Sequence, residues 1–121
     1  RLVHHELFHF ADYADDDQVK SDPQWVALND RWFVYGPGGR FTREPASSRK
    51  TDLAGFVTLY PRSALEEDKA ETFAFSMVDP RWVAERTEHD PVLARKVVAA
   101  RRQLERLSPS LDARFWTAQT P

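Results

Sequence analysis

Two Asp-Pro pairs constrain the fold of this 121-residue chain more than any other feature. In Asp79-Pro80 and Asp90-Pro91 the aspartate is a favoured helix N-cap, and proline suits the first helical position because that position needs no N–H donor. The pairs predict helices over residues 80–87 and 91–107. In the second of these, apolar side chains recur at spacings of four and three, as in a core-facing stripe: Leu93, Val97, Ala100, Leu104 and Leu107.

A third helix is predicted to begin at Ser63. Ser63 and Glu66 have the three-residue separation of a capping box, in which each side chain bonds the other's backbone N–H. The same segment carries a second stripe of apolar residues: Ala64, Leu65, Ala70, Phe73, Ala74 and Met77.

Residues 1–13 also have helical spacing, and we expect a buried helix there. Apolar groups recur at intervals of three and four, at Leu2, Val3, Leu7, Phe8, Phe10 and Ala11. The helix is expected to stop in the acidic turn Asp15-Asp16-Asp17. Pro23 then opens a short helical turn over Trp25, Val26 and Leu28.

Between these helices the sequence predicts extended structure. Residues 31–35 are β-branched and aromatic and lead into Gly36-Pro37-Gly38-Gly39, which favours a strand, a tight turn and a hairpin. Residues 42–54 have neither period, as in a long surface loop, and residues 55–60 form a short extended run closed by Pro61. The expected fold class is therefore α+β, mostly helical, with a short β-hairpin or small sheet.

Length and composition indicate one globular domain over residues 1–121. Seventeen lysines and arginines oppose 19 aspartates and glutamates, so there is no global basic field to attract nucleic acid, and the arginines of residues 95–106 belong to no binding motif. Apolar runs of a few residues are far below the roughly 20 that a spanning helix needs, so we expect a soluble protein without membrane insertion. The opening Arg1-Leu2-Val3 has no Met and no signal-like segment, which favours the C-terminal part of a longer chain.

Candidate chemistry lies inside the first predicted helix, in His5-Glu6-Leu7-Phe8-His9. A spacing of four puts both imidazoles on one helical face about 6 Å apart, so both can reach one Zn²⁺ at roughly 2.0–2.1 Å. Glu6 lies beside that position, where it can take a proton from metal-bound water and pass it to the leaving amine. The alternative is a helix with two incidental histidines. Because the chain has no cysteine, only histidines and carboxylates can complete a metal site.

A catalytic zinc ion needs a third protein ligand. The metzincin pattern fails, because Asp12 and Asp15 occupy the positions of its glycine and third histidine. Asp15 stays open as an unusual ligand. The better candidates are Glu67 and Glu71, one turn apart in the acidic cluster of the helix that follows Ser63, where burial would require a metal or a hydrogen-bonded histidine. The alternative is an exposed acidic first turn that the helix dipole favours.

The segments HELFHFAD and EDKAETFA together resemble the gluzincin metallopeptidases, which combine H-E-x-x-H with a helical E-x-x-A-E and include the catalytic domain of anthrax lethal factor. Bacterial zinc metallopeptidases of similar pattern look closer still. The matched motifs cover residues 1–13 and 55–78. The resemblance implies a zincin-like catalytic domain with three zinc ligands and one general base and acid. The implied ligands are His5, His9 and Glu67, and the implied base is Glu6.

The resemblance also implies supporting roles for three residues. Glu71 would hold a ligating histidine in the correct tautomer. Tyr60, seven residues before Glu67, would stabilise the oxyanion, although it could instead be a core aromatic at the end of a strand. Asp12 would be a carboxylate that closes the helix or supports a ligand. His4 points about 100° away from His5 around the helix, so we expect it to pack or lie at the surface.

Two functions follow as hypotheses. The first is zinc-dependent hydrolysis of a peptide bond in a peptide or protein substrate, with Glu6 activating the water and Tyr60 and the metal holding the oxyanion. The second is a non-catalytic metal-binding or protein-interaction module on a zincin-like scaffold.

Overall fold

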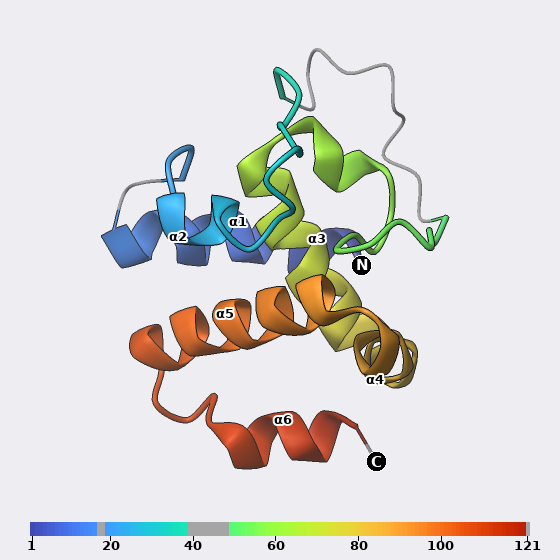
Figure 1. Cartoon of the computed structure of the whole chain (residues 1–121). Helices are drawn as coiled ribbons and strands as arrows, with labels where there is room; N and C mark the ends of the chain where they lie inside the picture. The colour runs from blue at the N-terminus through green and yellow to red at the C-terminus, as the bar shows by residue number, and fades with distance from the viewer. Residues whose placement is uncertain (17–18, 39–48, 121) are drawn as a thin grey trace.

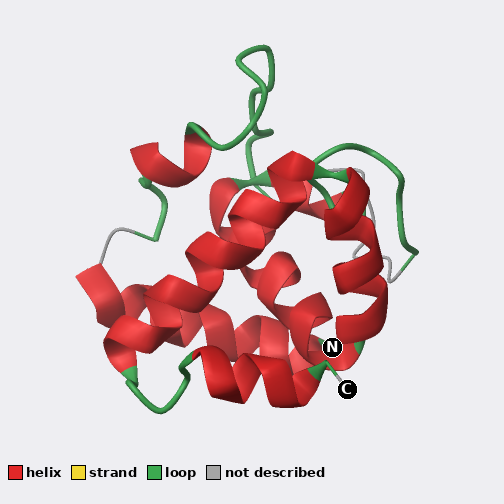
Figure 2. Cartoon of the chain, turned by 60° about the horizontal axis from the view of Figure 1, so that its bottom comes forward, coloured by secondary structure: helices red, strands yellow, loops and turns green. Residues whose placement is uncertain are grey.

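The computed structural model describes residues 1–16, 19–38 and 49–120, and regular structure in these ranges is entirely helical (Figures 1 and 2). The elements in chain order are α1 (Leu2–Asp16), α2 (Pro23–Val26), the 3₁₀ helix η2 (Tyr60–Ser63), α3 (Leu65–Val78), α4 (Pro80–His89), α5 (Pro91–Leu107) and α6 (Ala113–Gln119). Within these described ranges, no helix has both the length and the apolar content to cross a membrane.

The expected α+β class is wrong, because the predicted hairpin does not form in the part of the chain that the structure describes. Residues 31–35 do alternate like a strand: Phe33 packs on Phe56 at a ring distance of 4.8 Å, while Trp32 and Val34 are exposed. The backbone beyond them, however, bonds to η2 and not to a strand. The N–H of Gly36 donates to the carbonyl of Arg62 at 2.9 Å, and that of Gly38 donates to Ser63 at 2.7 Å.

The predicted run over residues 55–60 is likewise reduced to one isolated antiparallel bridge, between Lys50 and Thr58. The chain then tightens into η2 at Tyr60, with Pro61 in its first turn. Of the predicted surface loop over residues 42–54, residues 42–48 lie outside the described ranges. Residues 49–54 form no helix or strand, in agreement with the prediction.

Both Asp-Pro predictions are confirmed. An Asp79 oxygen accepts the N–H of Trp82 at 3.4 Å, and an Asp90 oxygen accepts the N–H of Leu93 at 2.9 Å. The predicted turn at Pro23 is also confirmed as α2, capped by Asp22. The capping box is wrong: Ser63 belongs to η2, its hydroxyl has no hydrogen bond, and α3 begins at Leu65 without a side-chain cap.

Helix α6 is absent from the sequence-based expectations. Its N-cap is Asp112, whose Oδ1 accepts the N–H groups of Arg114 and Phe115 at 2.9 and 3.1 Å. Trp116 anchors the helix in the core, where it is 5% exposed. An aspartate before the aromatic pair Phe115-Trp116 was the available signal.

Helix α3 lies at the centre of the molecule and contacts α1, η2, α4 and α5. Its two sides belong to two apolar clusters. Phe73 packs with Phe8 of α1 and with the α5 and α6 side chains Leu104 and Trp116. Phe75 packs with a second cluster made by Val57, Val83, Leu93 and Val97. Helix α3 therefore fixes the position of α1, which carries the two motif histidines.

The prediction of a buried helix at the N-terminus is half correct. Helix α1 forms, and Phe8 is fully buried against Phe73 at a ring distance of 5.3 Å. Its other large apolar side chains face solvent with 56–77% of their surface exposed: Leu2, Val3, Leu7, Phe10 and Tyr13. The inward face takes polar groups in their place, because His5 and Asp12 are both buried there.

Candidate metal centre

Three side chains from α1 and α3 converge on one point. Their ligand atoms are Nε2 of His5, Nε2 of His9 and Oε2 of Glu67, and these atoms lie within 4.8 Å of one another. The two ring nitrogens are 3.1 Å apart. The carboxylate oxygen lies 2.9 Å from the first nitrogen and 3.8 Å from the second.

This triangle has the size of one face of a zinc coordination tetrahedron. Two ligand atoms that each lie about 2.0–2.1 Å from a tetrahedral metal are about 3.3 Å apart. The observed edges of 2.9, 3.1 and 3.8 Å scatter on both sides of that value. The donor set also fits, since two imidazole nitrogens and one carboxylate oxygen are common zinc ligands.

Glu71 sets the tautomer of His5. Its Oε1 lies 2.8 Å from Nδ1 of His5, and because an ionised carboxylate only accepts hydrogen bonds, Nδ1 carries the proton. In the neutral ring the lone pair of Nε2 then faces Oε2 of Glu67 at 2.9 Å, whereas in the protonated ring Nε2 carries a proton directed at that oxygen. The position between these two atoms can therefore hold either a proton or a metal ion.

Glu71 is itself fully satisfied. It is 1% exposed, and both of its oxygens accept from Nη1 of Arg1 at 2.7 Å. The Thr58 hydroxyl donates to Oε2 at 3.3 Å. These contacts hold the carboxylate against His5 and match its charge, which is the usual arrangement behind a metal-binding histidine.

The pKa values of His5 and Glu67 show how strongly this site favours positive charge. Burial lowers the pKa of His5, but the carboxylates of Glu67 and Glu71 outweigh it and raise the pKa to about 9. Burial raises the pKa of Glu67, yet the imidazoles of His5 and His9 bring it down to about 2. The carboxylate of Glu67 therefore stays ionised, and its charge can be balanced either by a proton on a neighbouring imidazole or by a metal ion.

Glu6 and Tyr60 lie beside this centre. Glu6 is exposed on α1, between the two histidines in sequence. The ring of Tyr60 lies 6.3 Å from that of His5. Burial, then the charge of Glu67 and a hydrogen bond to it, and then the charges of Glu71 and Glu6 raise the pKa of Tyr60 to about 12, so its phenol stays a hydrogen-bond donor at neutral pH.

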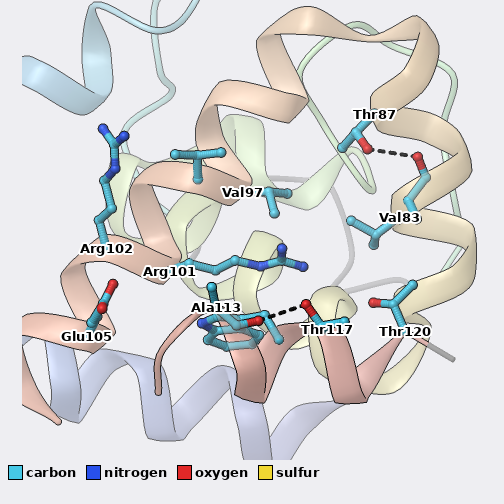
Figure 3. A pocket seen from close by; sticks show the side chains of 12 residues that line it. Val83, Thr87, Val97, Arg101, Arg102, Glu105, Ala113, Thr117 and Thr120 are labelled. Atoms are coloured by element: carbon cyan, nitrogen blue, oxygen red, sulfur yellow. Dashed lines mark hydrogen bonds between the residues drawn. The ribbon is translucent and has the colours of Figure 1, made fainter. Parts of the chain in front are cut away.

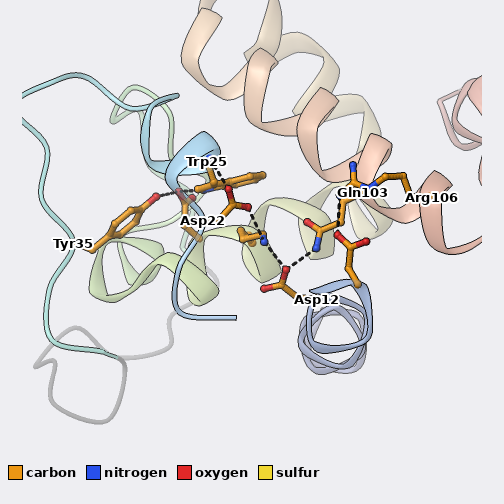
Figure 4. A network of polar contacts seen from close by, with 9 residues as sticks. Asp12, Asp22, Trp25, Tyr35, Gln103 and Arg106 are labelled. Carbon is orange, nitrogen blue, oxygen red and sulfur yellow. Dashed lines mark hydrogen bonds and ion pairs between the residues drawn. The ribbon is translucent and has the colours of Figure 1, made fainter. Parts of the chain in front are cut away.

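The remaining candidates have other partners. Asp12 is buried and accepts from Lys69 and from Gln103, the latter at 2.6 Å (Figure 4). Asp15 pairs with Arg106 at 2.7 Å. His4 lies edge-on to Phe73 with ring centres 6.2 Å apart, as expected of a packing residue.

Sequence reasoning missed two residues of the site, Arg1 and Thr58, which both bind Glu71. A threonine inside the apolar run Phe56-Val57-Thr58-Leu59 was a usable signal, because a buried hydroxyl needs a partner. Arg1 has no comparable pattern, since its partner lies 70 positions away.

Comparison with known proteins adds no family to this description. No protein-family model, no curated protein and no solved structure matches the chain.

Proposed function

We propose that this chain is a zinc-dependent peptidase domain that hydrolyses peptide bonds in a peptide or protein substrate. His5, His9 and Glu67 would hold the zinc ion. The observation that carries the proposal is the convergence of two imidazole nitrogens and one carboxylate oxygen, which lie 2.9–3.8 Å from one another.

The ligand set fits a catalytic zinc ion better than a structural one. Three protein ligands leave the fourth tetrahedral position open, whereas structural zinc sites use four. Two neutral imidazoles and one carboxylate also leave the centre with a formal charge of +1. When bound, zinc lowers the pKa of water from 15.7 toward about 7 and polarises a carbonyl group.

The protein's own residues would divide the proton chemistry between them. Glu6, exposed beside the two histidines, would accept the proton of the attacking water and return it to the leaving amine. The phenol of Tyr60, kept protonated by its surroundings, would donate a hydrogen bond to the developing oxyanion. Glu71 would keep the proton of His5 on Nδ1, so that Nε2 faces the metal.

One observation favours the second hypothesis, a metal-binding module that docks a partner protein. The exposed face of α1 carries five large apolar side chains, and large exposed apolar patches often mark interaction surfaces. Glu6 lies among them. The same face would serve a non-catalytic scaffold or a peptidase that binds an apolar substrate segment, so catalysis has to be measured directly.

The test separates metal binding from turnover. Protein purified without chelator should hold about one zinc per chain by elemental analysis, and His5→Ala should lose it. Glu6→Gln should keep the zinc but lose hydrolysis of casein or of a peptide library by at least about 100-fold, the usual contribution of a general base. Glu88→Gln, an exposed change on α4, is the charge-matched control and should behave as wild type.

Two outcomes contradict the proposal. Full hydrolysis by Glu6→Gln would remove the mechanism, and zinc binding without any hydrolysis by the wild type would favour the non-catalytic module.

A further inference from the structure

A groove of about 510 Å³ lies between α4, α5 and α6 (Figure 3), and none of the candidate metal ligands of α1 and α3 lines it. Its walls are largely apolar and include Val83, Val97, Val98 and Trp116. The volume falls within the range of about 300–1,000 Å³ that is typical of small-molecule sites. The groove is therefore large enough for a ligand of modest size.

Arg101 extends from α5 into this groove between its apolar walls (Figure 3). Its guanidinium carbon lies 5.0 Å from the centre of the Trp116 ring. Its Nε is buried and has no hydrogen-bond partner, and among the described residues no carboxylate lies within ion-pair distance. Burial lowers the pKa of Arg101, with no neighbouring anion to oppose the effect.

Other arginines with restricted exposure have such partners. Arg86 pairs with Asp90 at 2.9 Å, and Arg1 pairs with Glu71 at 2.7 Å. Arg101 is partly withdrawn from water, and among the described residues its recorded contact is the face of the Trp116 ring. A partly buried charge without an anion carries an uncompensated desolvation cost, which a bound anion would relieve.

The other charged groups of the groove leave it positive. They are Arg102 and Glu105, which are both exposed and lie at the left of Figure 3. Their charges cancel, so Arg101 sets the net charge of the lining. A guanidinium presents paired N–H groups that match a carboxylate, and the valine and tryptophan walls suit a hydrocarbon chain.

From this geometry we infer that the groove between α4, α5 and α6 binds a small carboxylate with an apolar body, of the medium-chain fatty-acid type, with its head group on Arg101. The site is separate from the metal centre and does not depend on the zinc proposal. Two interactions would contribute to binding: a charge-assisted hydrogen bond between Arg101 and the carboxylate, and burial of the ligand's hydrocarbon chain.

The experiment measures binding by isothermal titration calorimetry. Octanoate and, separately, 1-octanol are titrated into the protein, whose metal content is left as purified. Octanoate should bind saturably and at least about tenfold more tightly than the alcohol, since only the acid carries the matching charge. Arg101→Gln should weaken octanoate binding by at least about tenfold. The matched control is Arg81→Gln, which removes one exposed positive charge from α4 outside the groove and should leave binding unchanged.

A second measurement avoids any dependence on the folding of a variant. In wild-type protein, the NMR signal of the Arg101 side-chain N–H should shift as octanoate is added and stay in place when acetate is added at the same concentration. Three results would overturn the inference: octanol binds as tightly as octanoate, acetate binds as tightly as octanoate, or octanoate still binds to Arg101→Gln. In the last case the ligand would lie elsewhere, for example on the metal.

Discussion

Adjacent residues of α3 face two different environments. Asp68 is fully buried, and its Oδ2 lies 2.7 Å from Nζ of Lys96, 2.6 Å from the Tyr35 hydroxyl and 3.0 Å from Nε1 of Trp25. Glu67 points to the other side of the helix. Its Oε2 lies 2.9 Å from Nε2 of His5 and 3.8 Å from Nε2 of His9. One carboxylate is neutralised by a lysine, and the other lies against two imidazoles.

This difference distinguishes a structural acid from a candidate metal ligand. Asp68 already has its cation, and burial raises the pKa of Asp68 and lowers that of Lys96, which reflects the cost of holding both charges without water. Two other acids behave in the same way, because Glu71 pairs with Arg1 and Asp12 pairs with Lys69. Glu67 instead faces two imidazoles, so its counter-charge is either a proton on a ring or, as proposed above, a metal ion from solution.

The largest effect should come from breaking the structural pair. Asp68→Asn leaves Lys96 charged and buried, so we expect a loss of about 3–5 kcal/mol in the free energy of unfolding. The measurement is urea denaturation. Asp68→Asn combined with Lys96→Met should recover most of that loss, because the double variant removes both charges. If Asp68→Asn were as stable as wild type, the Asp68–Lys96 pair would have to be exposed to water.

Glu67→Gln should separate the two acids by their response to metal. At a zinc concentration about 100 times the dissociation constant, binding to the folded state adds about 2.7 kcal/mol of stability. We expect wild type to gain this increment in a thermal melt and Glu67→Gln to gain none. Glu66→Gln, a neighbouring acid of the same helix turn, is the control and should respond as wild type. A zinc-dependent gain in Glu67→Gln would remove Glu67 from the ligand set.

Glu71→Gln should have an intermediate effect. The amide can no longer hold His5 as a carboxylate does, and loss of such a partner lowers metal affinity by about 10–100-fold. The zinc dissociation constant, measured by competition with a chromogenic chelator, should rise by that factor. A loss of binding as complete as in His5→Ala would instead suggest that Glu71 contacts the metal directly.

The sequence predicts the helices where local chemistry decides them. In Asp79-Pro80 and Asp90-Pro91 the aspartate caps the helix and the proline occupies its first turn, both within a few residues of the helix start. The strand at residues 31–35 failed because a strand needs a neighbour. Phe33 alternates with exposed residues as a strand would, but Gly36 and Gly38, which follow the segment, bond to η2, and only the tertiary structure supplies that information.

The orientation of α1 shows a second limit. The spacing of the apolar residues predicts a helix there, but it does not say which side of the helix faces inward. The apolar side chains Val3, Leu7 and Phe10 are exposed, while His5 and Asp12 are buried because α3 offers them Glu71 and Lys69. The candidate ligands could be named from their spacing and from the gluzincin resemblance. Their charge matching could not, since it depends on contacts between residues far apart in the chain.

Thr58→Val should have the smallest effect and tests how finely Glu71 is supported. The variant removes one hydrogen bond, at 3.3 Å, and leaves the 2.7 Å contacts from Arg1 in place. A neutral hydrogen bond of this kind contributes about 0.5–1.5 kcal/mol to stability, and the long distance favours the lower end. We therefore expect a small loss in urea denaturation and a zinc affinity well within tenfold of wild type. If affinity instead falls as far as in Glu71→Gln, then the threonine, and not the arginine, holds the carboxylate against His5, and the ion pair with Arg1 is secondary to the site.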